Sequence, residues 1–182
     1  MTDVVRTVGL EAVAAVRVLE KALLPIRRPE RPVVVVGLSS YGQATYESFS
    51  NSGIGCNGLT AARHLLLSEA YARRYPETVE PELSRPYQGS HTLLTEVAGE
   101  PLGKLLLSPT RTYLPLLREL YRAHRGAIYG VIHCTGGGQR KALKYFPATY
   151  IRKENFLPLP PVFALLEGRR PWQELFEVFN MG

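Results

Sequence analysis

Gly130-Val131-Ile132-His133-Cys134-Thr135-Gly136-Gly137-Gly138 is a short apolar run that ends in three consecutive glycines, and Gln139-Arg140-Lys141-Ala142-Leu143-Lys144 follows it. This order predicts a strand over residues 127–134, a glycine loop, and a helix that reaches about Phe146. A loop without Cβ atoms just before a helix presents backbone N–H groups to an anion. The stretch therefore predicts either a phosphate-binding loop or a tight turn whose glycines only supply unusual dihedral angles.

A second strand is predicted over residues 33–38. Val33-Val34-Val35-Val36-Gly37-Leu38 is a β-branched run of the length expected for a strand buried on both faces. Residues 7–18 also alternate like a strand, although the alanines among them are good helix formers. The proline-rich residues 25–32 then form a predicted linker.

Helices are predicted between and after the strands over 33–38 and 127–134. A helix over about residues 59–75 has Asn57 as its candidate N-cap and an apolar inner face at helical spacing, made of Leu59, Ala62, Leu66 and Ala70. Another begins near Pro115 and ends at Gly126. Shorter helices are predicted after Pro160-Pro161 and from Pro171. Strands that alternate with helices predict an α+β or α/β domain, with helices packed on a mixed β-sheet.

The composition narrows the class of protein. The chain has 182 residues, of which 45% are hydrophobic and 21% charged, enough for one domain with a real core. No apolar run approaches the length of a membrane helix, and the first residues lack the features of a secretory signal, so we expect a cytoplasmic protein without a membrane partner. Cys56 and Cys134 have no metal-ligand spacing and are expected to be buried and reduced.

The net charge of +6 comes from 22 basic and 16 acidic residues that are spread along the chain. Nucleic-acid binding would favour clustered basic residues with interleaved aromatic residues, so no nucleic-acid partner is expected. Anionic small ligands fit the charge equally well. The 28 residues from 76 to 103 carry four prolines and no periodicity, which predicts a surface loop of the length often found near functional sites.

Three features could carry chemistry. Gly53-x-Gly55-x-x-Gly58 matches the dinucleotide fingerprint, but fourteen residues separate it from the preceding strand, so only a looser phosphate contact from Asn57 and Gly58 is expected. Arg111 precedes a helix N-terminus, where a cation is disfavoured unless an anion lies between. Arg111 is either a solvated arginine or an arginine whose planar guanidinium binds a phosphate or a carboxylate. His133 is either a general acid or base or a histidine satisfied by its neighbours.

Four segments stand out in order along the chain. They are Val36-Gly37-Leu38-Ser39-Ser40 leading to Asn57-Gly58-Leu59, Leu107-Ser108-Pro109-Thr110-Arg111-Thr112-Tyr113, His133-Cys134-Thr135-Gly136-Gly137-Gly138, and Pro160-Pro161-Val162-Phe163 with Phe179-Asn180-Met181-Gly182. Together they resemble the C-terminal half of the aminoimidazole ribonucleotide synthetases, also called phosphoribosylformylglycinamidine cyclo-ligases. Residues 41–52 resemble the family variant that has a long loop before the asparagine-glycine turn.

This resemblance implies a mixed sheet flanked by helices, distantly like a ferredoxin fold. It implies an enzyme of purine biosynthesis that uses ATP and magnesium to phosphorylate the formyl oxygen of formylglycinamidine ribonucleotide before ring closure. The candidate residues of this chain are then His133 for catalysis and a ligand wall made of Asn57, Gly58, Thr110, Arg111, Thr135, Gly136, Gly137 and Gly138. No metal ligand is assigned to the chain.

The resemblance also implies a domain division. Residues 1–31 are expected to be the last strand of a missing N-terminal domain plus a linker, and residues 32–182 the C-terminal domain, shortened at its end. In the family, the N-terminal domain holds most of the ATP and metal site and forms most of the homodimer contact, so we expect no ATP held and no turnover by this chain alone. Gly55-Cys56-Asn57-Gly58 departs from the commoner His-Ser-Asn-Gly turn and lacks its histidine.

Two alternatives remain open from the sequence. One is another member of the same superfamily, such as formylglycinamidine ribonucleotide synthetase or selenophosphate synthetase, against which the Ser-Pro-Thr-Arg and His-Cys-Thr-Gly-Gly-Gly segments argue. The other is a non-catalytic domain that binds a phosphorylated ligand or pairs with a separately encoded nucleotide-binding subunit.

Overall fold

The structure is a computed structural model that describes residues 12–19, 23–134, 138, 141–146 and 148–166. In chain order its elements are β1 (Tyr41–Gly42), β2 (Asn51–Ser52), α1 (Gly55–Leu66), α2 (Glu69–Arg74), η2 (Pro76–Thr78), β3 (Glu96–Val97), β4 (Glu100–Pro101), α3 (Leu102–Leu106), α4 (Leu114–His124), η3 (Arg125–Ala127), α5 (Lys141–Tyr145) and α6 (Pro161–Ala164). Strands β1 and β2 pair antiparallel, as do β3 and β4. The fold is therefore of the α+β class.

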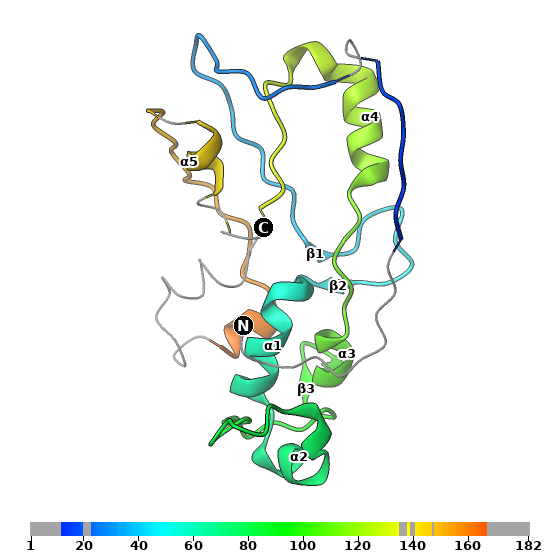
Figure 1. Cartoon of the computed structure of the whole chain (residues 1–182), viewed down its shortest axis with the longest axis vertical. Coiled ribbons are helices and arrows are strands. Elements are labelled where there is room, and N and C mark those ends of the chain that lie inside the picture. The colour runs from blue at the N-terminus through cyan, green and yellow to red at the C-terminus, as the bar shows by residue number, and fades with distance from the viewer. Residues whose placement is uncertain (1–11, 20–22, 135–137, 139–140, 147, 167–182) are drawn as a thin grey trace.

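The hydrophobic core lies around α1. Ala62 and Leu66 on this helix are fully buried, as is Leu102 at the start of α3, and Phe163 of α6 is 1% exposed. Figure 1 shows α1, α2, α3 and α6 gathered in the lower body of the molecule. Burial of large apolar side chains is the main favourable term in folding, so this body is where the described part of the chain gains most of its stability.

The predicted helix over residues 59–75 is wrong as one helix, because the chain forms α1 and α2 with an extended break at Leu67. At the break the Ser68 N–H donates to the His91 carbonyl (3.0 Å), and the Gly89 N–H donates to the Leu67 carbonyl (3.0 Å). These tertiary bonds outweigh helix propensity. The predicted inner face is confirmed at Ala62 and Leu66, whereas Ala70 is exposed.

The predicted strands over residues 33–38 and 127–134 are also wrong, since neither segment forms a ladder. Val34 is 87% exposed and Val36 is 75% exposed, so this run is not buried on both faces. The Arg27 N–H donates to the Tyr129 carbonyl (2.8 Å), but this contact does not extend into a sheet. A β-branched run forms a strand only when another segment pairs with its backbone. Among the described residues, no segment pairs with either run in this way. The described residues of 7–18 form no regular structure either.

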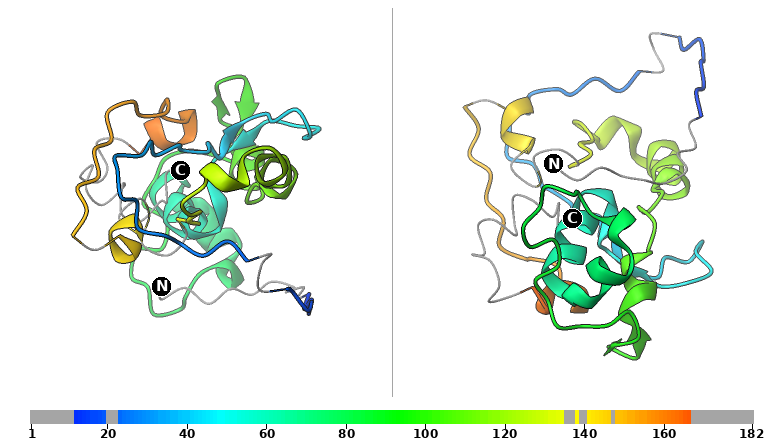
Figure 2. Two further views of the ribbon diagram at one scale, coloured as in Figure 1. Left: turned by 90° about the horizontal axis from the view of Figure 1, so that it is seen from above. Right: turned by 60° about the horizontal axis from the view of Figure 1, so that its bottom comes forward.

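Helix α4 confirms the prediction of a helix that begins near Pro115 and stops before Gly126. Leu117, Leu120 and Tyr121 are half-buried on one side, while Leu114 is 69% exposed. Figure 2 shows α4 to one side of the body that contains α1 and α2. Helices α5 and α6 confirm the predicted helices after the glycines and after Pro160, and the helix predicted from Pro171 lies outside the described residues. Among the described helices, none has both the length and the hydropathy needed to cross a bilayer.

The prediction of an irregular surface loop over residues 76–103 is wrong in part. This stretch contains η2, the β3–β4 hairpin and the buried side chain of Tyr87. The Tyr87 ring lies 5.2 Å from the His64 ring, and its hydroxyl is 3.1 Å from that of Thr78. The stretch therefore contributes to the core rather than only covering it.

Gly89 gives a direct test of how closely this stretch packs on α1. A Cβ at Gly89 would lie 2.0 Å from the Leu66 carbonyl oxygen, so Gly89→Ala must displace backbone and should lower the free energy of unfolding by about 3 kcal/mol. Gly126→Ala is the matched control, because a Cβ there meets nothing within 4 Å. Urea denaturation measures both variants. Equal stabilities would contradict the close approach.

Candidate functional site

The start of α1 is held in place by bonds from β2 to α3 and to the segment that follows α3. The Asn51 amide donates to the Pro109 carbonyl (2.7 Å), and the Ser52 hydroxyl donates to the Leu105 carbonyl (2.7 Å). Both residues are only 2% exposed. Polar groups this deeply buried are costly unless they are hydrogen-bonded, so these bonds fix the two segments against each other.

The same two side chains shape the turn into the helix. The Gly53 N–H donates to Asn51 Oδ1 (2.9 Å), and the Ile54 N–H donates to Ser52 Oγ (3.3 Å). Gly53 and Gly55 have φ values of +79° and +56°, a region in which glycine carries little steric cost. Asn51 and Ser52 are not among the residues predicted from the sequence, although an Asn-Ser-Gly run is typical of a turn.

Asn57 and Gly58 lie in the first turn of α1, so the prediction of Asn57 as the N-cap is wrong. Ile54 occupies the cap position and makes no side-chain cap bond. Thr110 is exposed and close to this turn, because a Cβ placed at Gly55 would lie 3.8 Å from its Oγ1. The first N–H groups of a helix have no partner within the helix, so Thr110 stands beside a set of possible anion donors.

Arg111 is buried, with a side chain only 6% exposed. Its guanidinium donates five hydrogen bonds: Nε to Glu47 Oε1 (2.9 Å), one terminal nitrogen to the carbonyls of Ser39 (2.6 Å) and Tyr41 (3.3 Å), and the other to Glu47 Oε2 (2.7 Å) and the Gly42 carbonyl. A guanidinium has five N–H donors, so all of them are used. The interpretation of Arg111 as a solvated arginine is wrong, and the carboxylate that its fork holds is that of Glu47.

Glu47 closes a turn of its own loop. Its Oε2 accepts from the Ala44 N–H (2.8 Å), and its N–H donates to the Ala44 carbonyl (2.9 Å). The bonds from Arg111 and from Ala44 hold the pKa of the Glu47 carboxyl below its ordinary value. Glu47 is also absent from the residues predicted from the sequence. Its isolation in the sequence is a signal that could have identified it, since Glu47 is the only acidic residue between positions 31 and 68.

Tyr113 and Lys153 are further perturbed groups of this region. Burial raises the pKa of the Tyr113 phenol, an effect that the charge of Arg111 opposes. Burial lowers the pKa of the Lys153 ammonium, and a charge on Cys134 acts in the opposite direction. Cys134 is half-buried, carries a free thiol, and is near enough to influence both groups.

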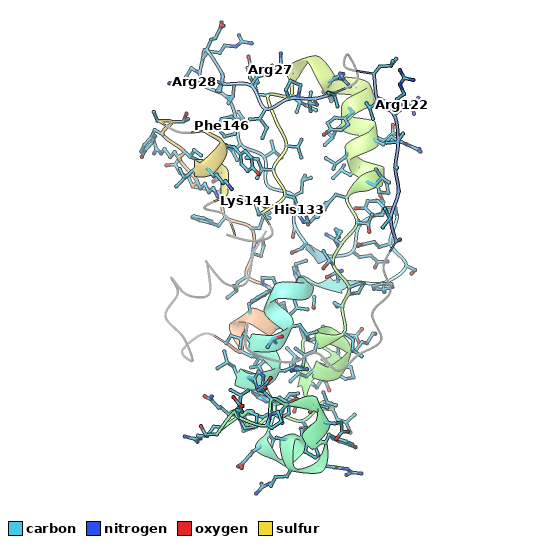
Figure 3. All side chains as sticks on the ribbon, in the orientation of Figure 1. Arg27, Arg28, Arg122, His133, Lys141 and Phe146 are labelled. Carbon is cyan, nitrogen blue, oxygen red and sulfur yellow. The ribbon has the colours of Figure 1, made fainter. Side chains whose placement is uncertain are left out.

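The remaining predicted residues are only partly described. His133 is exposed on the 128–134 segment (Figure 3). Gly138 is buried with a φ of +54°, while Thr135, Gly136 and Gly137 lie outside the described residues. In the described part of the chain, no three His, Cys, Asp or Glu side chains form a group that could hold a metal ion. The structure thus places Thr110 beside Gly55, the first residue of α1, with Arg111 turned toward Glu47.

Curated relatives of the chain share one name. Over 168 residues it is 31% identical to the phosphoribosylformylglycinamidine cyclo-ligase of Bacillus cereus (strain B4264), which covers 90% of this chain and 40% of that protein. The enzyme of that name from Bifidobacterium longum (strain DJO10A) is 32% identical over 137 residues, 72% of this chain and 34% of the relative. That from Enterococcus faecalis (strain ATCC 700802 / V583) is 37% identical over 94 residues, 49% of this chain and 27% of the relative.

The chain is homologous to a part of the phosphoribosylformylglycinamidine cyclo-ligases. This confirms the resemblance inferred from the four segments. The chain spans between 34% and 41% of the length of the Bifidobacterium and Bacillus cyclo-ligases that it matches. No family model matches the chain.

The Glu47–Arg111 ion pair of this cyclo-ligase homologue predicts a dependence of stability on pH. Because the folded pKa of Glu47 is lowered, the pair stabilises the fold above the ordinary glutamate pKa of 4.5, and this contribution is lost as pH falls through the lowered value. The unfolding free energy of Glu47→Gln should therefore lie furthest below that of the wild type at neutral pH, and the gap should close in acid.

Urea denaturation at pH values between about 7 and about 3 measures this gap. Glu77→Gln changes an exposed glutamate of η2 and should stay within about 0.5 kcal/mol of the wild type at neutral pH. A gap between Glu47→Gln and the wild type that is the same at all pH values would show that the charge of Glu47 does not stabilise the fold.

Proposed function

We propose that this chain forms the substrate-side wall of a phosphoribosylformylglycinamidine cyclo-ligase, which makes aminoimidazole ribonucleotide in purine biosynthesis. The observation that carries the proposal is the shared name of relatives that match 72% to 90% of the chain. The placement of Thr110 beside the first turn of α1 supports it, because two segments of the resemblance meet there. The net charge of +6 suits a phosphorylated ligand.

In the proposed reaction the γ-phosphoryl group of ATP passes to the formyl oxygen of formylglycinamidine ribonucleotide, and ADP leaves. A nitrogen of the substrate then attacks the activated carbon, the carbon–oxygen bond breaks, and inorganic phosphate leaves as the imidazole closes. The ribose phosphate is negatively charged throughout, and further negative charge develops on the departing phosphate as the carbon–oxygen bond breaks. N–H groups at a helix start and a hydroxyl such as that of Thr110 are donors suited to such oxygens.

The proposal assigns ATP and Mg²⁺ to a nucleotide-binding domain that this chain would contact, in an enzyme expected to be a cytoplasmic homodimer. The described part of the chain offers an exposed apolar segment for such a contact, since Val34 and Val36 are 87% and 75% exposed. In the complete cyclo-ligase we expect a mixed sheet of the distantly ferredoxin-like kind, larger than the two antiparallel pairs found among the described residues. His133, Thr135 and Gly136 to Gly138 would complete the wall.

The direct test is binding of formylglycinamidine ribonucleotide to the purified chain. We expect the amide resonances of Gly55, Gly58 and Thr110 to shift on titration. Thr110→Val should weaken binding about tenfold, because a hydrogen bond to a charged group is lost. Thr112→Val is the matched control, since Thr112 is also exposed and its carbonyl accepts from Tyr46 (3.0 Å), a bond that valine retains.

Turnover is measured in the same preparation with ATP and Mg²⁺ present. The proposal expects binding without imidazole formation, because the ATP site is assigned to another domain. Ring closure by the chain alone would contradict that assignment. Equal affinities of Thr110→Val and Thr112→Val would remove Thr110 from the wall.

A further inference from the structure

Glu47 and Arg111 are 64 positions apart in sequence and form a bidentate ion pair whose side chains are 14% and 6% exposed. Exposed ion pairs contribute little to stability, but a pair shielded from water that makes further hydrogen bonds holds its partners in a defined geometry. Removing one partner leaves the other charge poorly compensated. This pair is therefore a strong constraint on where the two segments lie.

Arg111 also joins the chain on the other side of the loop. Its remaining donors bind the carbonyls of Ser39, Tyr41 and Gly42, which lie before and within β1. The loop 39–47 is thus held at both ends by one guanidinium. Tyr46 adds a bond from its hydroxyl to the Thr112 carbonyl (3.0 Å), directly after Arg111.

Thr110 precedes Arg111 and lies beside Gly55 at the start of α1. On its other side, Pro109 accepts from the Asn51 amide. The backbone of Thr110 is consequently fixed between two anchors, of which Arg111 is one. Small displacements of a donor change its interaction with a ligand strongly, because hydrogen bonds weaken steeply with distance and angle.

We propose that Glu47 is a positioning residue of the ligand wall. By holding Arg111, Glu47 fixes the position of Thr110 relative to the first turn of α1. Arg111 then supports the backbone of Thr110 and does not itself contact the ligand. This inference rests on the proposed function of that wall. Glu47 lies within residues 41–52, the long loop that resembles a variant of the family, so the proposal gives this loop a role.

A competing arrangement would have an anionic ligand displace Glu47 from Arg111. The bonding argues against it, since all five donors of Arg111 have acceptors within the chain and Oε2 of Glu47 also accepts from Ala44. A ligand would have to break three bonds of the Glu47 carboxylate before it reached the fork. The two arrangements predict opposite effects of removing the carboxylate.

The test is a sulfate titration of the 182-residue chain at neutral pH, followed by the amide resonances of Gly55, Gly58 and Thr110. Glu47→Gln should weaken sulfate binding about fivefold, measured on folded protein, with a displaced Thr110 resonance. Arg111→Gln should weaken it to a similar extent, and the double variant should be no weaker than either single one, because the two residues act as a unit. Glu77→Gln, the exposed control, should bind like the wild type.

Glu47→Asp keeps the carboxylate and should recover part of the lost affinity, and it also serves as the deciding comparison should Glu47→Gln fail to fold. The free energy of unfolding of each variant distinguishes a positioning role of Glu47 from a purely structural one. If the role is purely structural, the Glu47 variants lose stability but the folded molecules keep the wild-type affinity for sulfate. Unchanged affinity in both Glu47 variants would overturn the positioning role and leave the proposed function standing. Tighter binding would overturn it in favour of displacement. Absence of any sulfate effect on these resonances in the wild type would overturn the wall itself.

Discussion

The five hydrogen bonds of the Arg111 guanidinium are the constraint on which the candidate site depends. They join the loop 39–47 to the segment that carries Thr110, and Glu47 supplies the only negative charge in that part of the sequence. An arginine so enclosed cannot remain buried without acceptors for all its donors. The loop conformation, its ion pair and the position of Thr110 are thus parts of one arrangement.

The lower body gives this arrangement a fixed base. Ile54, at the entry to α1, is 1% exposed, and α1 continues into the core through Ala62 and Leu66. Ser52 ties that entry to the end of α3 through the Leu105 carbonyl. Because core packing sets the helix axis, the N–H groups of its first turn have a fixed direction.

Helices were the predictable part of this chain. Local signals decide them: Pro115 lies in the first turn of α4, and the spacing of Ala62 and Leu66 marks the buried face of α1. The valines of residues 33–36 carry an equally strong local signal for a strand, yet strand formation depends on partners elsewhere in the chain or in another domain. The prediction of Asn57 as the N-cap of α1 is wrong because the entry to this helix is fixed by tertiary hydrogen bonds from Asn51 and Ser52. Glu47 and Arg111 are 64 positions apart, so their pairing cannot be predicted from a single sequence. The sequence shows only an isolated acidic residue at 47 and an arginine before a helix at 111.

We infer that the Glu47–Arg111 pair makes residues 39–53 fold as one unit against Pro109 and Thr110. Amide hydrogen exchange measures this most directly, at Tyr41, Ala44, Ser52 and Gly53, whose N–H groups donate to Ser39, Glu47, Ser108 and Asn51. The account predicts that these four amides are protected together in the wild type and lose protection together in Glu47→Gln, while core amides of α1 such as Leu66 stay protected. Protection at Tyr41, Ser52 and Gly53 that survives the loss of the carboxylate would contradict it.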